Sequence, residues 1–129
     1  MKNFGLLNRI LLGLVMLIPG LFKLFVAGPD AVVGMMQGIV IFAWAPVFWA
    51  WVLILSEIIF GIAILANFKI EYTTIPPIII LLVAAFTVYF NYQDLLKVNW
   101  PTFLLHIAAA SNYALLGYHG YTCAHGKVR

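Results

Sequence analysis

The chain has 129 residues, of which 65% are hydrophobic and only 9% charged, and its mean hydropathy is +1.08. Soluble domains average about 25% charged residues, so this composition excludes a soluble globular enzyme and predicts an integral membrane protein. The net charge of +3 comes from only seven scattered Lys and Arg residues, which predicts no nucleic-acid partner. The length predicts a single transmembrane domain over residues 1–129 in the lipid bilayer.

Four apolar stretches are each bounded by charged residues, Gly or Pro. A helix of about 20 residues crosses the hydrocarbon core at about 1.5 Å per residue, and the two shorter stretches reach that length with their aromatic flanks. Because the core excludes unpaired backbone groups, the prediction is an all-α membrane protein, a four-transmembrane-helix bundle. The predicted spans are residues 6–26, 47–66, 75–90 and 103–118.

Residues 28–45, between the first two spans, are too apolar for an ordinary loop. Gly34 and Gly38 interrupt them too often for a fifth span, while Pro29 and Asp30 resemble a helix start. These features predict a short interfacial or re-entrant helix.

The distribution of cations predicts the orientation of the spans. Five of the seven cations fall on the side that holds both termini, which predicts a multi-pass protein of the cell membrane with both termini cytoplasmic. These five are Lys2, Arg9, Lys69, Lys127 and Arg129. Aromatic side chains are expected to gather at the opposite, outer interface: Trp44, Trp49, Trp51, Tyr89, Tyr92 and Trp100.

Glu57 stands near the middle of the second predicted span. An ionised group there costs about 2.5 to 3.5 kcal/mol to insert, so it needs a partner or a purpose. Arg9 and Lys23 share one stripe of the first predicted helix with Gly13 and Gly20, and either cation could reach toward Glu57. Two interpretations stay open, an ion pair that only holds two helices together and a buried charge cluster that binds a proton, ion or ligand.

Two polar side chains of the later spans are candidate second contributors, Asn91 and His106. His106 could relay protons or donate to a quinone carbonyl, although its position favours a packing histidine. The C-terminal residues His119, Cys123 and His125 provide too few ligands for a closed zinc site, so no metal site and an unstructured tail are expected, with no redox role assigned to Cys123. Phosphate-binding loops, the GxSxG elbow and HExxH are missing from the sequence.

Two segments of the chain carry a family resemblance. The first runs Asn8-Arg9-Ile10, Gly13 and Pro19-Gly20-Leu21-Phe22-Lys23-Leu24, and the second is Leu55-Ser56-Glu57-Ile58-Ile59-Phe60-Gly61. Their order resembles the DoxX family of small four-helix membrane proteins, with Arg9, Gly20, Lys23 and Glu57 at motif positions. Asn91 departs from the family, since many members place a His there.

The resemblance implies a membrane subunit accessory to a quinone-linked oxidoreductase, with quinone as the cofactor and redox complex subunits as partners. Because no metal or flavin motif is visible in the sequence, such a subunit would depend on those partners for electron transfer. A small proton-coupled transporter and a module that binds a lipid or client protein are the alternatives, and a homo-oligomer stays open. The sequence does not decide whether the protein is an enzyme.

Overall fold

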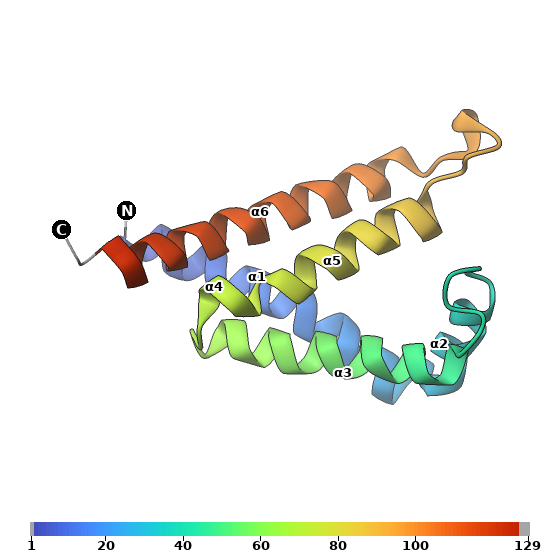
Figure 1. Cartoon of the computed structure of the whole chain (residues 1–129), viewed down its shortest axis with the longest axis horizontal. Helices are drawn as coiled ribbons and strands as arrows, with labels where there is room; N and C mark the ends of the chain where they lie inside the picture. Colours follow the sequence, from blue (N-terminus) through green and yellow to red (C-terminus); the bar gives the residue numbers. More distant parts are fainter. Residues whose placement is uncertain (1, 127–129) are drawn as a thin grey trace. The chain divides into compact units, whose positions relative to one another are not determined.

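The computed structural model describes residues 2–126, and the regular structure within that range is entirely helical, which confirms the all-α class. Lys127 and Arg129, used above to predict the orientation, lie outside the described residues, as does the side chain of Lys2. The chain divides into two compact units, one ending at Phe68 and one beginning at Lys69 (Figure 1). Each unit is a helical hairpin with a shorter helical segment attached.

The first unit is built from two long helices and one short one. Its elements are α1 (Lys2–Phe22), the π-helical turn η1 (Lys23–Ala27), α2 (Pro29–Gln37) and α3 (Pro46–Leu65). Pro29 and Pro46 open α2 and α3, where a missing N–H costs little. Gly28, between η1 and α2, has φ +82°, a left-handed backbone conformation that glycine adopts without strain. This turn redirects the chain, so that α2 packs against α3.

The second unit pairs α5 with α6. Its elements are α4 (Ile70–Thr73), α5 (Ile75–Ala84), the π-helical turn η2 (Ala85–Tyr89), the 3₁₀ turn η3 (Leu95–Lys97) and α6 (Trp100–His125). Prolines open α5 and α6, and the side chain of Asn99 caps α6 by accepting from the backbone N–H of Thr102 at 3.3 Å.

The prediction of an unstructured C-terminal tail was wrong for the described residues, because α6 continues to His125. No proline follows Pro101, so nothing removes a backbone donor from the later turns. Polar side chains in these turns bond back to the helix, for example the hydroxyl of Thr122 to the carbonyl of His119 at 2.9 Å. The exposed pair His119 and Cys123 lies on one face, with Nε2 and Sγ 3.8 Å apart.

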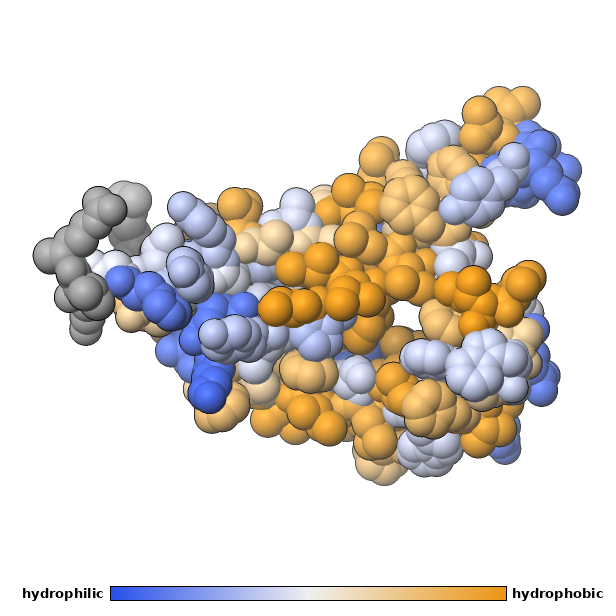
Figure 2. All heavy atoms as spheres, in the orientation of Figure 1, coloured by the Kyte–Doolittle hydropathy of each residue, from blue (hydrophilic) through white to orange (hydrophobic). Residues whose placement is uncertain are grey.

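Three helical segments of the described chain are long and apolar enough, by length and composition, to cross a membrane: Asn3–Ala27, Pro46–Leu65 and Ile70–Tyr89. Their outward faces expose large hydrophobic side chains, and Figure 2 shows hydrophobic residues over much of the visible surface. Lipid can cover such faces, whereas water would make them a severe aggregation hazard. The predicted fourth span, residues 103–118, lies within α6 and stays a prediction.

Candidate functional site

Glycines let α1 and α3 approach closely. A Cβ built on Gly61 would lie 2.7 Å from the backbone N and 2.9 Å from the Cα of Leu17, closer than real Cβ atoms come. A Cβ on Gly20 would lie 2.9 Å from the Cβ of Glu57. Such contact through small residues is the usual way in which membrane helices associate, because lipid supplies no hydrophobic force between them.

These contacts also fix the register of the two helices. Gly13 faces Leu65, Leu17 faces Gly61, and Gly20 faces Glu57, so rising numbers on α1 meet falling numbers on α3. The helices are therefore antiparallel, and Glu57 lies level with Gly20, almost one turn before Lys23.

Lys23 and Glu57 form an ion pair in this unit. The Nζ of Lys23 donates to both carboxylate oxygens of Glu57, at 2.6 Å and 2.7 Å. The Glu57 side chain is only 6% exposed, whereas that of Lys23 is 24% exposed. Charge-assisted bonds of this length are among the stronger hydrogen bonds in proteins, and burial of the carboxylate makes its partner indispensable.

Lys23 occupies a distinctive place in the backbone. It is the first residue of η1, the five-residue π-helical turn that ends at Ala27, directly before Gly28. Short π-helical segments are uncommon and occur frequently at functional sites, because the wider turn re-aims side chains. Here the turn carries the Lys23 ammonium toward α3.

Apolar side chains surround the α3 side of the pair. A buried cluster joins α2 to α3, and its α3 members lie about one and two turns before Glu57 in the chain. The cluster consists of Val32, Met36, Ala50 and Ile54. Leu24, next to Lys23, and Ile58, next to Glu57, pack against this cluster. The Lys23 donor and the Glu57 acceptor thus lie next to apolar side chains. Helix α2 packs against the turns of α3 that precede Glu57.

Arg9, the other candidate cation, is far from Glu57. It precedes Gly20 by eleven residues, which is roughly 17 Å along the helix axis at about 1.5 Å per residue. That distance exceeds the length of an Arg side chain. Its Nε is buried without a hydrogen-bond partner among the described residues. Lys23 is therefore the cation that contacts Glu57.

Asn91 and His106 both belong to the second unit and have local partners there. The Oδ1 of Asn91 accepts from the backbone N–H groups of Gln93 at 2.9 Å and Asp94 at 3.1 Å, as in an Asx turn. The Nδ1 of His106 lies 2.8 Å from the carbonyl oxygen of Thr102, and its ring centroid lies 4.6 Å from that of Tyr89. These contacts favour a packing histidine, and the contribution of both residues to the Glu57 site stays a prediction.

Trp49 has a packing role in addition to the interfacial one that the sequence predicts. Its ring packs against Phe42 and Phe48, with centroids 5.2 Å away in both cases, and its Nε1 is buried without a hydrogen-bond partner among the described residues. The sequence feature that indicates this packing is helical spacing: Trp49 stands four residues before Leu53, which packs against the same cluster, and next to the buried Ala50. Trp49 thus belongs to the packing between α2 and α3.

A comparison of the sequence with family models matches residues 4–90 to the DoxX family. The match runs from the first turn of α1 through η2 and therefore contains both partners of the ion pair. No curated protein and no solved structure matches the chain at a significant level.

Proposed function

The chain belongs to the DoxX family, and from this membership we propose that it is a small membrane subunit accessory to a quinone-linked oxidoreductase. The observation that carries the proposal is the ion pair of Lys23 and Glu57 between two membrane-type helices. A pair that only joins helices could be replaced by apolar residues at little cost, whereas binding of a polar headgroup requires a donor and an acceptor. The partners proposed are the catalytic subunits of the redox complex.

The residues around the pair suit a quinone ring. A Lys ammonium has three donors, and Glu57 takes up two of them, which leaves one N–H of Lys23 for a quinone carbonyl within the part of the chain that the structure describes. Leu24 and Ile58, each next to one member of the pair in the chain, provide apolar contacts beside it. When bound, a quinone would supply two-electron redox chemistry, and Glu57 would accept a hydrogen bond from the hydroxyl of its reduced form. Arg9 lies too far along α1 to take part.

We further propose that four helices span the cell membrane, with α6 as the fourth and α2 in the outer interface. The 26 residues of α6 measure about 39 Å at about 1.5 Å per residue, which is longer than the hydrocarbon core. Four spans put both termini on one side, and the excess of Lys and Arg makes that side cytoplasmic.

The proposed orientation can be tested with Cys123, the single cysteine of the chain. Because it is exposed near the end of α6, a membrane-impermeant maleimide should leave it unlabelled in intact cells and label it after the membrane is opened. A matched variant, Cys123→Ser with Gln93→Cys, should give the opposite result, since Gln93 lies in the loop before α6. Labelling of Cys123 in intact cells would show that the C-terminal end of α6 lies outside the cell and would contradict the proposed orientation.

The proposed function can be tested by native mass spectrometry after gentle solubilisation from native membranes. The wild-type chain should carry oxidoreductase subunits or a quinone-sized adduct, and Glu57→Gln should lose the quinone several-fold, because a neutral amide with one acceptor oxygen holds the Lys23 ammonium less firmly than a carboxylate does. Asp94→Asn is the matched control, since it neutralises a carboxylate that pairs with a Lys outside the site.

Two outcomes would contradict the accessory role. A chain that carries only lipid, with no partner subunit and no quinone, would favour a lipid- or client-binding module. Substrate-linked proton movement in liposomes that is lost in Glu57→Gln would favour the proton-coupled transporter instead. Equal quinone retention in Glu57→Gln and wild type would leave the ion pair as a structural contact only.

A further inference from the structure

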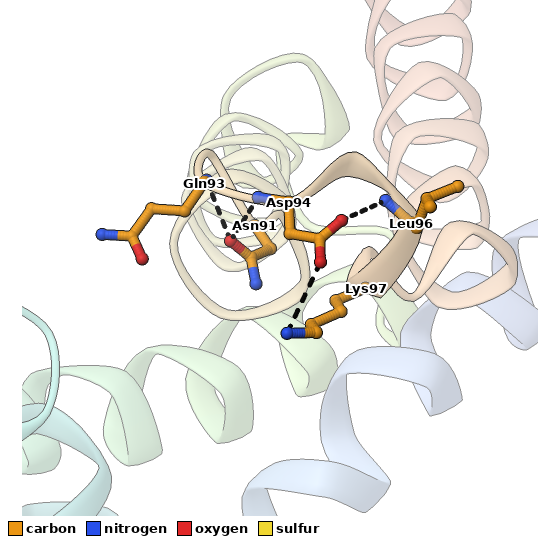
Figure 3. Close-up of polar contacts among 5 residues, drawn as sticks. All are labelled: Asn91, Gln93, Asp94, Leu96 and Lys97. Carbon is orange, nitrogen blue, oxygen red and sulfur yellow. Dashed lines mark hydrogen bonds and ion pairs between the residues drawn. The ribbon is translucent and has the colours of Figure 1, made fainter.

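The loop between η2 and α6 is held in one conformation by its own polar side chains. Asn91 accepts from two backbone N–H groups, and Asp94 accepts from the backbone N–H of Leu96 at 3.0 Å and pairs with Lys97 at 3.4 Å (Figure 3). The backbone N–H of Asn99 donates to the carbonyl oxygen of Tyr89 at 3.3 Å, and this bond joins the two ends of the loop. The loop is therefore a pre-organised turn.

This turn presents apolar side chains outward. Leu96 is 95% exposed and Leu95 is 59% exposed, although both lie in the 3₁₀ turn η3 that the Asp94 side chain caps. Capping holds the backbone in the conformation in which both leucine side chains are exposed. In Figure 3 the side chain of Gln93 points to the opposite side of the loop from Leu96.

We propose that Leu95 and Leu96 insert into the headgroup layer of the lipid bilayer and anchor this end of the second unit. The inference rests on the membrane span proposed for Ile70–Tyr89, which ends directly before the loop. The polar layer of a bilayer extends about 5 to 8 Å beyond the hydrocarbon core on each side. A loop that closes at Tyr89 begins at the boundary of that layer.

A contact with α6 keeps the turn at this depth. The indole Nε1 of Trp100 donates to the carbonyl oxygen of Leu95 at 3.1 Å, so η3 stays within one Trp side-chain length of the first residue of α6. The loop therefore does not extend freely into water.

The residues beside the leucines favour lipid as the occupant. Tyr92 and Trp100, both exposed, are of the aromatic types enriched at membrane interfaces. Asp94 and Lys97 neutralise each other, so the loop carries no net charge to repel headgroups. A pair of leucines surrounded by interfacial aromatics in a loop without net charge suits a headgroup layer.

The test uses single-cysteine variants in a Cys123→Ser background, each labelled with a nitrobenzoxadiazole fluorophore. The purified full chain is reconstituted in vesicles of phosphatidylcholine and phosphatidylglycerol. Leu96→Cys probes the turn, Gln93→Cys is the matched control in the same loop, and Ile79→Cys probes the centre of the span, where the side chain is 55% exposed. The fluorescence of each labelled variant is quenched with aqueous iodide and, separately, with lipids that carry a spin label in the headgroup or deep in the acyl chain.

The expected result is a gradient of depth. Position 96 should be quenched by headgroup spin labels and be several-fold less sensitive to iodide than position 93, while position 79 responds to the deep label. Equal iodide quenching at 96 and 93, with 79 still deep, would overturn the anchor and leave the span intact. Loss of deep quenching at 79 would instead overturn the proposed span. Shielding of position 96 in native membranes but not in these vesicles would identify a protein partner and also overturn the anchor.

Discussion

Replacing Lys23 with methionine is expected to destabilise the first unit by about 3 to 5 kcal/mol, because it leaves the Glu57 carboxylate without its partner in a buried position. The Glu57 side chain is 6% exposed, and its carboxylate oxygens accept from the Lys23 ammonium at 2.6 Å and 2.7 Å. Removing the carboxylate instead, in Glu57→Gln, should cost less, since the partly exposed Lys23 can turn toward the interface. Both costs can be measured by SDS titration in mixed micelles, followed by circular dichroism.

The double variant Lys23→Met with Glu57→Gln separates the pair from its surroundings. It should be more stable than Lys23→Met alone, because no buried charge then lacks a partner. Lys97→Met is the matched control, since it breaks an exposed pair whose contribution is about 0 to 1 kcal/mol. A cost for Lys23→Met no larger than that of Lys97→Met would contradict a buried pair.

The same double variant distinguishes a structural contact from a binding site. If the pair only holds α1 against α3, the double variant should bind partner subunits and quinone as wild type does. If the pair binds the ligand, stability returns in the double variant while quinone retention stays lost. Stability and retention must therefore be measured on the same preparation.

Much of the first unit could be predicted from the sequence, because its signals are local. Proline positions predicted where α2 and α3 begin, and the spacing of Gly13, Gly20 and Lys23 predicted that one stripe of α1 faces a partner helix. Apolar length predicted the two segments of this unit that are long and apolar enough to cross a membrane. Each of these features depends on neighbouring residues in one helix, which is the information that a periodic pattern contains.

The choice between Arg9 and Lys23 as partner of Glu57 could not be predicted. Both lie about equally far from the centre of the first span, so the answer depends on the register of α1 against α3. That register is set by a contact between Gly61 and Leu17, residues 44 positions apart, and no pattern within either helix specifies it. The π-helical turn at Lys23 was equally hidden, because it has no known sequence signature.

Asn91 illustrates a different reason why a sequence pattern does not specify a local structure. Its spacing from Thr87 resembles a polar stripe inside a membrane helix, yet the chain leaves the helix at Phe90, where φ is −101° and ψ is 128°. The side chain then accepts from the next backbone N–H groups, as Asn often does in turns. A stripe two residues beyond a helix end has no structural meaning, and helix ends are the least predictable boundaries.

Replacing Gly61 with alanine is the second substitution with a large expected effect. The added Cβ would lie 2.7 Å from the backbone N of Leu17, and a backbone atom cannot rotate away as a side chain can. The helices must therefore separate, which lengthens the contact between Lys23 and Glu57 as well as the packing around it. We expect a loss of about 1 to 3 kcal/mol in the same SDS titration.

Two glycines of α1 provide graded controls for this substitution. In Gly13→Ala the new Cβ would lie 2.6 Å from the Cγ of Leu65, a side chain that can move, so the cost should be smaller than for Gly61→Ala. In Gly5→Ala nothing lies within 4 Å, and the better helix propensity of alanine should stabilise by about 0.5 to 1 kcal/mol. Equal costs at positions 61, 13 and 5 would mean that close approach of the backbones does not hold α1 on α3. The predicted order would instead show that the contact which positions Lys23 beside Glu57 depends on the absence of a Cβ at Gly61.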